Sequence, residues 1–107
     1  MEKRSKAETF IGFAMRKGEY RFGGNACKSL KHANLIIVCK TAAKNSLDMS
    51  LSLANKFNCK RFITKEKTLA ELTKKENAKI MAITDKELAK AISENPENDL
   101  TECLIGE

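Results

Sequence analysis

The stretch RFGGNACKSLK, which begins at Arg21, carries residue types suited to holding a negatively charged ligand. Gly23 and Gly24 can take positive φ angles, and they leave no Cβ between the backbone and a ligand. The residues that follow are predicted to begin a helix whose free N–H groups point outward and attract anions. Lys28 and Lys31 are three residues apart, on about the same side of that helix, where they would meet phosphates.

Asn25 and two aromatic side chains extend this candidate site toward nucleic-acid bases. The Asn25 amide can cap the helix, or it can offer a donor and an acceptor to a base edge. Tyr20 and Phe22 flank Arg21, and such rings either stack on an unpaired base or pack in the core. The alternative for the whole stretch is a tight turn followed by a solvated basic face. It matches neither the P-loop nor the G-x-G-x-x-G pattern.

Charge is distributed unevenly along the 107 residues, which include 20 Lys and Arg against 14 Asp and Glu, a formal net charge of +6. Residues 1–46 carry ten basic and three acidic side chains, residues 47–84 eight and four, and residues 85–107 two and seven. A basic body favours nucleic acid as the partner, with an anionic membrane surface or plain solubility as alternatives. Lys40 and Lys44 add positive charge near the carboxyl end of an apolar run, although a solvated pair is the simpler interpretation.

The four cysteines lie far apart, without a C-x-x-C pair, and the chain has one histidine. This is not the spacing of a zinc site, so we expect no metal and no cofactor. Cys27 and Cys39 fit reduced, buried thiols that act as small hydrophobes. The N-terminal residues are charged and then too short in apolar content to export or anchor the chain, so we expect a cytoplasmic protein.

No residue is predicted to be catalytic. His32 has no evident partner for acid–base chemistry, and Cys39 lacks a motif that would activate its thiol. Asp85 fits a helix cap better than a metal ligand. Cys39 and Thr64 occupy strand ends where a phosphorylated receiver domain would need acidic residues. We therefore predict a protein that is not an enzyme.

Three short apolar runs predict strands, and a further strand is expected at about residues 19–22. The runs are LIIVC at Leu35–Cys39, RFIT at Arg61–Thr64 and KIMAIT at Lys79–Thr84. Because LIIVC is apolar at every position, we expect it to be covered on both faces. Between the strands, apolar residues recur at helical spacing. They are Phe10, Ile11 and Ala14; Leu30 and Ala33; Leu47, Leu51, Ala54 and Phe57; and Leu88, Ala91 and Ile92.

Three matches to the S/T-x-x-E capping box predict helix starts, at Ser5–Glu8, Thr68–Glu71 and Thr84–Glu87. The short connections imply a parallel sheet, because a parallel crossover needs about a dozen residues and a helix supplies them. The predicted fold class is α/β: a three-layer α/β/α sandwich with a small, mostly parallel mixed sheet of about four strands.

A single domain is expected, because a chain of this length suffices for one core. We place the RNA-binding α/β domain at residues 1–94 and an acidic C-terminal tail at residues 95–107. The tail contains the only proline and shows no sustained period, which is typical of disorder. The alternative is that Leu104 and Ile105 pack on the body.

The order of these segments resembles the kink-turn RNA-binding ribosomal proteins, the family of archaeal L-seven-Ae and eukaryotic L-thirty-e, and most closely its small bacterial YlxQ-like branch. The resemblance runs from about Thr9 to Ile92 through AETFIGFAMRKG, GGNACKSLKHAN, LIIVCK, TAAKNS and IMAITDKELAKAI. It implies a three-layer α/β/α sandwich. It also implies RNA contact through a G-x-N-E-x-x-K-like segment at the start of the second helix and through a loop before the last strand.

Three residues match the opening of the family's first RNA segment: Gly23, Gly24 and Asn25. Ala26 stands where the family often has Glu, and Ser29 where it often has Lys, although a neighbouring lysine can replace the charge. These departures bear on the recognition of sheared G·A pairs in a kink-turn. The resemblance therefore supports RNA binding more directly than kink-turn specificity.

The second loop that the resemblance implies is KKENAK, at Lys74–Lys79, with Lys74, Lys75 and Asn77 as candidate contacts. We predict a non-enzymatic, monomeric, ribosomal-protein-like protein that binds structured RNA, which is ribosomal RNA, another non-coding RNA or an mRNA leader. Neither DNA nor a membrane is an expected partner. Two other classes stay open: a protein-interaction adaptor of the same fold, and a small nucleotide-binding or enzymatic α/β domain.

Overall fold

The computed structural model describes residues 5–97 and 99–103, which alternate between helix and strand. Within these residues the helices are α1 (Lys6–Lys17), α2 (Gly24–Lys28), α3 (Lys44–Phe57), α4 (Leu69–Thr73) and α5 (Lys86–Glu94). The strands are β1 (Tyr20–Phe22), β2 (Leu35–Val38), β3 (Lys60–Thr64), β4 (Ile80–Ile83) and β5 (Leu100–Cys103). The first four strands confirm the strands predicted from the sequence to within one residue at each end.

The described strands form one mixed sheet in the order β1-β4-β2-β3-β5. β2 and β3 run parallel, with Leu35 opposite Lys60 and Val38 opposite Ile63. The pairings of β1 with β4, β2 with β4 and β3 with β5 are antiparallel. The α/β class and the mixed sheet are confirmed. The sheet is not mostly parallel, however, and it has five described strands where about four were expected. The chain turns back into β4 and inserts this strand between β1 and β2.

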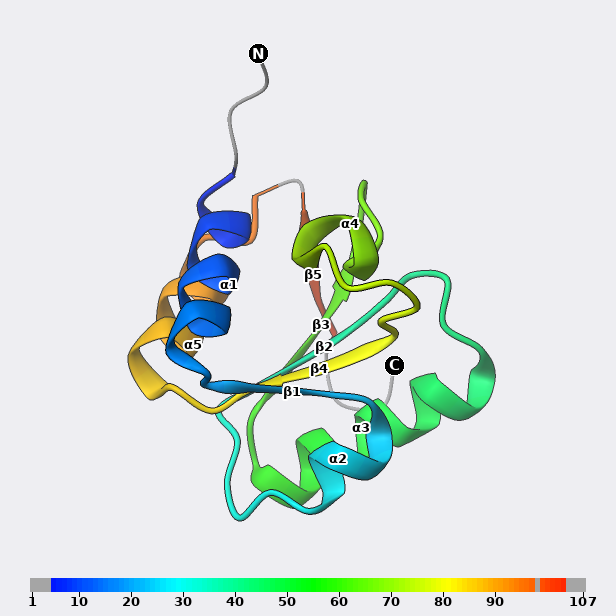
Figure 1. The fold of residues 1–107 in the computed structure, drawn as a ribbon. Helices are drawn as coiled ribbons and strands as arrows, with labels where there is room; N and C mark the ends of the chain where they lie inside the picture. Colours follow the sequence, from blue (N-terminus) through cyan, green and yellow to red (C-terminus); the bar gives the residue numbers. More distant parts are fainter. Residues whose placement is uncertain (1–4, 98, 104–107) are drawn as a thin grey trace.

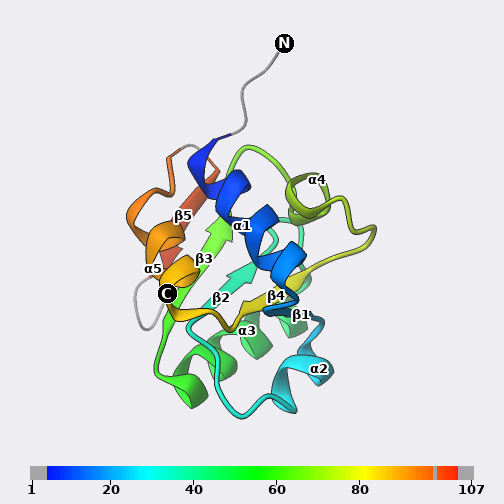
Figure 2. The same ribbon diagram turned by 60° about the vertical axis from the view of Figure 1, so that its left-hand side comes forward.

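Helices cover both faces of the sheet and make three layers (Figures 1 and 2). α1, α4 and α5 lie on one face, and α2 and α3 lie on the other. Each face has its own buried cluster, with Ile37 and Phe62 on the α1 side and Ile36 and Val38 on the α3 side. Because side chains alternate along a strand, neighbouring residues of β2 enter opposite clusters. This explains why a strand in the middle of the sheet is apolar throughout.

Two of the three predicted helix caps are confirmed. The Ser5 hydroxyl accepts from the Glu8 N–H at 3.0 Å at the start of α1. Thr68 and Glu71 satisfy each other's backbone N–H groups in a full capping box at the start of α4. Each bond pairs a donor that the first helical turn would otherwise leave unpaired.

The third predicted cap is displaced by one residue. Asp85, and not Thr84, caps α5 by accepting from the Leu88 N–H at 2.9 Å. The Thr84 hydroxyl instead donates to the Glu19 carboxylate at 2.6 Å. Asp85 also pairs with Lys17 at the end of α1, and the hydrogen bond from Lys17 holds the pKa of Asp85 below its ordinary value. The role of Asp85 as a cap is as predicted.

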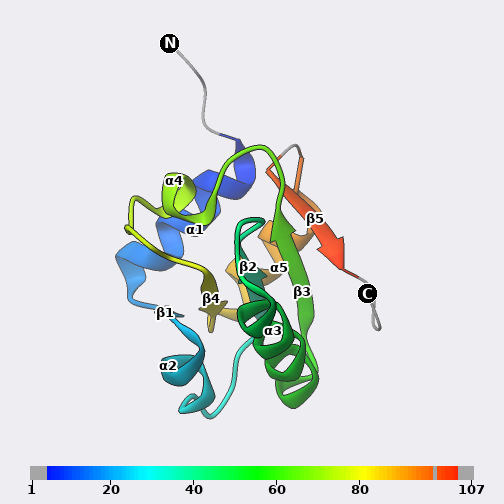
Figure 3. The ribbon, with the colours of Figure 1, turned by 90° about the vertical axis from the view of Figure 1, so that its right-hand side faces the viewer.

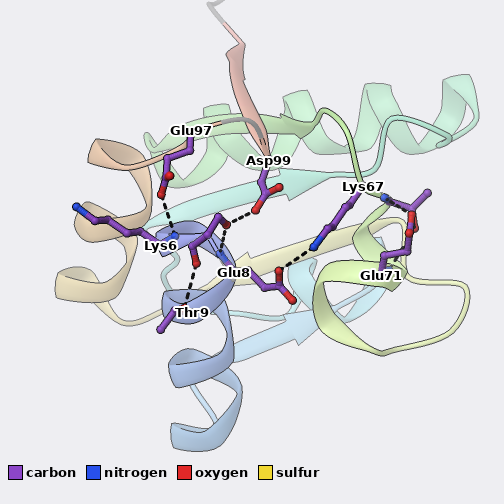
Figure 4. A network of polar contacts seen from close by, with 9 residues as sticks. Lys6, Glu8, Thr9, Lys67, Glu71, Glu97 and Asp99 are labelled. Carbon is purple, nitrogen blue, oxygen red and sulfur yellow. Dashed lines mark hydrogen bonds and ion pairs between the residues drawn. The ribbon is translucent and has the colours of Figure 1, made fainter. Parts of the chain in front are cut away.

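Polar contacts join the start of α1 to the turn before β5 and to the loop after β3 (Figure 4). The Ser5 hydroxyl donates to the carboxylate of the buried Asp99, whose carbonyl accepts from the Lys65 N–H at 2.8 Å. The carboxylate of Glu8, also buried, lies 3.1 Å from the Lys67 ammonium. Burying a carboxylate costs free energy unless it is paired, so these contacts tie the two ends of the described chain together.

Residues 95–107, predicted to be an acidic tail, contain a strand. β5 lies along β3 at the edge of the sheet, with Leu100 opposite Thr64 (Figure 3). Leu100 is 2% exposed and belongs to the cluster on the α1 side. The prediction of disorder is therefore wrong for this strand. Leu104 and Ile105 lie outside the described residues.

α2 ends earlier than the sequence predicts. It spans Gly24–Lys28, so Leu30 and Ala33 lie in the connection to β2 and not on a helix. Both residues still pack into the cluster on the α3 side, and their spacing imitates a helical face for that reason. Lys31 likewise lies beyond the helix, so it does not share a helical side with Lys28.

Replacing Leu100 with Ala should lower the free energy of unfolding by about 2 to 5 kcal/mol, because it removes a buried side chain and leaves a cavity. Urea unfolding of the 107-residue chain, followed by circular dichroism, measures the change. Thr101→Ala, at an exposed position of the same strand, is the matched control and should shift the free energy by less than about 0.5 kcal/mol. A Leu100→Ala variant as stable as the unchanged chain would contradict the burial of β5.

Candidate functional site

A hollow of about 320 Å³ lies at one end of the sheet, where the turn between β1 and α2 meets the loop between α4 and β4. In Figure 1 these segments and the start of α3 lie toward the right-hand end of the sheet. This is the end at which β1 and β2 finish and β4 begins, since Phe22 pairs with Met81 and Val38 with Ile80. The lining residues are Phe22, Gly23, Gly24, Ser46, Lys75, Glu76, Asn77, Ala78, Lys79 and Ile80.

Gly23 makes the turn at the edge of the hollow. Its φ of 87° and ψ of 146° form a combination that residues with a Cβ rarely adopt. The Gly23 N–H donates to the Ile80 carbonyl at 2.9 Å, and the Gly23 carbonyl accepts from the Cys27 N–H at 3.0 Å. The turn is thus fixed to the first residue of β4. The predicted positive φ is confirmed at Gly23.

Gly24 is required for a different reason. The prediction of a positive φ is wrong at this position, since Gly18 and Gly23 are the described glycines that have one. A Cβ on Gly24 would instead lie 2.8 Å from Cγ of Met49 on α3. The absence of a side chain lets the start of α2 approach α3, and a β-branched residue here would have to displace Met49.

The loop between α4 and β4 forms the other wall of the hollow. Lys74 and Asn77 both have a φ of 62°, in the left-handed region that asparagine tolerates better than most residues. The Lys79 carbonyl accepts from the Cys39 N–H at 2.8 Å, and the Lys79 ammonium donates to the Thr41 hydroxyl at 2.8 Å. The loop is therefore attached to the end of β2.

Exposed lysines lie in the hollow and at the same end of the sheet. Lys75 and Lys79 line it together with Glu76, so its lining has a net positive charge. Lys40 and Lys44 are exposed at the same end of the sheet, directly after β2 and at the first residue of α3. The Lys40 ammonium donates to a backbone carbonyl at 2.9 Å, and the Lys44 ammonium lies 4.0 Å from an acidic side chain one turn further along α3. Both lysines remain accessible to a ligand.

The Cys39 thiol is buried behind this end of β2 and is 0% exposed. Its sulfur accepts from the Leu69 N–H at 3.3 Å and lies 3.1 Å from the Thr41 hydroxyl oxygen. Burial raises the pKa of this thiol, but the hydrogen bonds from Thr41 and Leu69 outweigh burial and hold the pKa below its ordinary value. Burial raises the pKa of Cys27 and of Cys59 to about 11. Cys27 and Cys39 are free, buried thiols, as predicted.

Four predicted contact residues, Arg21, Asn25, Lys28 and Lys31, do not line the hollow. The Arg21 guanidinium donates to a carbonyl of its own strand at 2.6 Å. Asn25 is exposed on α2 and does not cap it, because the helix begins before this residue. Lys28 ends α2, and Lys31 lies in the connection that leads to the opposite end of the sheet. The predicted residues that line the hollow are Gly23, Gly24, Lys75 and Asn77, with Lys40, Lys44 and Lys74 at the same end.

Sequence reasoning missed Ser46 and Lys79, although both belong to segments that it singled out. Lys79 ends KKENAK and Ser46 ends TAAKNS. Lys79 adjoins the apolar run of β4, and the sequence therefore predicts it to be the first residue of that strand. The rings of Phe22 and Tyr20 pack edge to face, with centroids 5.3 Å apart, against the core on the α1 side. Both rings pack against the core, and Phe22, which is half-buried, also lines the hollow.

Comparison with protein-family models and with curated proteins found no match to this chain. The part of the chain that the structure describes holds no group of three or more His, Cys, Asp or Glu placed to bind a metal ion. Within the same residues, no helix is both long and apolar enough to cross a membrane. The candidate site rests on its own geometry and charge.

Replacing Gly23 with Ala should lower the free energy of unfolding by about 1 to 3 kcal/mol, because the backbone conformation at this position strains any residue with a Cβ. Gly12→Ala is the matched control, since Gly12 lies within α1 and nothing is within 4 Å of the added Cβ. This change should raise the free energy of unfolding by about 0.4 to 1 kcal/mol. Urea unfolding compares the two variants, and effects of the same sign would contradict the assigned turn.

Proposed function

We propose that this protein binds structured RNA at the hollow between the β1–α2 turn and the α4–β4 loop. The observation that carries the proposal is the meeting of two segments that are far apart in the chain. Gly23 and Gly24 line one side of the hollow, and Lys75, Asn77 and Lys79 line the other. Residue chemistry and the family resemblance both select the first segment, and the family resemblance alone selects the second.

Affinity in this proposal comes from phosphates. Lys40, Lys44, Lys75 and Lys79 are exposed at one end of the sheet, and each phosphate that a lysine neutralises releases counterions. The Gly23 turn adds a place where the RNA backbone can approach closely, because nothing lies within 4 Å of the position that a Cβ would take. Lysines and an open turn suit a ligand with several negative charges.

Selectivity in this proposal comes from an unpaired base. Phe22 offers an aromatic surface and Asn77 an exposed amide to the same hollow. Proteins that recognise RNA sequence stack and hydrogen-bond bases in loops and bulges in this way. The hollow of about 320 Å³ is at the lower end of the range of ligand sites, about 300 to 1,000 Å³. It suits a single base from an internal loop better than a paired duplex.

The loop between α4 and β4 is the proposed determinant of specificity. Asn25, which the family resemblance assigns to the first RNA segment, and the neighbouring Lys28 do not line the hollow. Lys75 and Asn77 line it. Binding of structured RNA is the general proposal, and recognition of a kink-turn is a more specific form of it. In the same proposal the protein is a monomeric, cytoplasmic RNA-binding protein of ribosomal type and not an enzyme.

Lys75→Gln combined with Lys79→Gln should weaken RNA binding and reduce the salt dependence of the logarithm of affinity by about 1.4 to 1.8 in slope, for two lost phosphate contacts. The probe is a labelled RNA hairpin whose internal loop has tandem sheared G·A pairs and one unpaired nucleotide. The same hairpin with Watson–Crick pairs in place of the loop is the comparison. Fluorescence anisotropy at several salt concentrations measures the affinity for each hairpin and its salt dependence.

Lys86→Gln combined with Lys90→Gln is the matched control, because it removes equal charge from α5 at the other end of the sheet. It should leave the salt slope nearly unchanged. Equal affinity for the two hairpins would contradict the assigned base site. Equal slopes for the two double variants, or no binding of either hairpin at low salt, would contradict the RNA-binding surface.

A further inference from the structure

A second hollow, of about 810 Å³, lies at the opposite end of the sheet. It is bounded by the end of α3, the starts of β2 and β3, one side of α5 and the end of β5. Leu35, which lines it, pairs with Ile83, whereas Val38 pairs with Ile80 beside the first hollow. The two hollows share none of the described residues, so each can be tested apart from the other.

The walls of the second hollow are largely apolar. Leu51, Ala54 and Phe57 line it from α3, and Ala89 lines it from α5. Leu51 and Phe57 are half-buried, so part of each side chain remains open to the hollow. Ligand sites are commonly concave and apolar, with a few polar groups that fix orientation, and have volumes of about 300 to 1,000 Å³. The second hollow fits both descriptions.

Arg61 is the most buried polar residue among those that line this hollow. It is 6% exposed, and its guanidinium donates to the Ser50 hydroxyl on α3 at 3.2 Å. A guanidinium stays charged at any physiological pH, and it matches a carboxylate, sulfonate or phosphate group through parallel donors. Lys60, Lys86 and Lys90 also line the hollow and are exposed. The basic groups therefore come from both β3 and α5.

Two acidic side chains, Glu94 and Glu102, also line the hollow. Four basic groups against these two leave a net charge of +2. Both carboxylates are exposed, whereas Arg61 is buried, so solvent screens the acidic groups more strongly than it screens the guanidinium. Within this hollow, the surroundings of Arg61 are therefore the most favourable place for an anion.

We propose that this second hollow binds a small organic anion with a flat apolar body, such as an aromatic carboxylate, sulfonate or phosphate ester. The apolar body lies against Leu51 and Phe57. The anionic group accepts from the Arg61 guanidinium, and Lys86 and Lys90 add attraction from the side of α5. A neutral ligand of the same shape gains only the apolar contacts, so charge and shape are both required.

The test uses 1-naphthalenesulfonate as the probe and 1-naphthalenemethanol as its neutral counterpart, each titrated into the isotopically labelled 107-residue chain. The sulfonate should bind at least about tenfold more tightly than the alcohol, because a hydrogen bond between charged groups contributes more free energy than one to a neutral group. Amide NMR shifts should change at Leu35, Arg61 and Lys90. Equal affinities, shift changes at other places, or no binding at millimolar probe would overturn the proposal.

Variants separate this site from the first hollow. Arg61→Gln should weaken sulfonate binding about tenfold or more and leave alcohol binding nearly unchanged. If that variant does not fold, Lys86→Gln combined with Lys90→Gln, which changes only exposed side chains, decides the question and should weaken the sulfonate severalfold. Lys75→Gln combined with Lys79→Gln is the control at the first hollow. This control should bind the sulfonate as tightly as the unchanged chain does. If it loses as much sulfonate affinity as the Lys86 and Lys90 double variant, the proposal is overturned.

Discussion

The position of β4 in the sheet is the constraint on which the rest of the structure depends. This strand buries all four of its residues and pairs antiparallel with both β1 and β2. At its start, the Ile80 carbonyl accepts from the Gly23 N–H, and the preceding Lys79 carbonyl accepts from the Cys39 N–H. Three segments that are remote in the chain therefore meet at fixed backbone spacing. The exposed lysines and Asn77 owe their common location to the pairing of this buried, apolar strand with its neighbours.

Much of the fold follows from local patterns with a strong physical basis. A strand covered on both faces is apolar at each position, so LIIVC and IMAI are recognisable without knowledge of their neighbours. The caps at Ser5 and Thr68 follow from the need to pair the free N–H groups of a first helical turn. Part of the candidate site is predictable for a similar reason. The Gly23 turn is evident from residue type, whereas the loop at Lys74–Lys79 is predicted only through the family resemblance.

Other features depend on tertiary packing that no local pattern expresses. A strand buried on both faces has the same composition whether it runs parallel or antiparallel, so the direction of β4 was not predictable. β5 has Leu100 as its one fully buried side chain, and it follows a polar stretch that resembles a tail. Leu30 and Ala33 pack from an irregular connection with helix-like spacing, which led to a predicted helix that is too long. The prediction that Lys31 lies on this helix is wrong for the same reason.

RNA contact at the first hollow is tested most directly by amide NMR of the isotopically labelled chain, titrated with the hairpin that carries sheared G·A pairs and an unpaired nucleotide. We predict the largest shift changes at Gly23, Gly24 and residues 75–79, with little change at Lys60 and Lys86 beside the second hollow. This pattern is expected because the two hollows lie at opposite ends of the sheet. The largest changes at Lys60 and Lys86, or no changes at any RNA concentration, would contradict it.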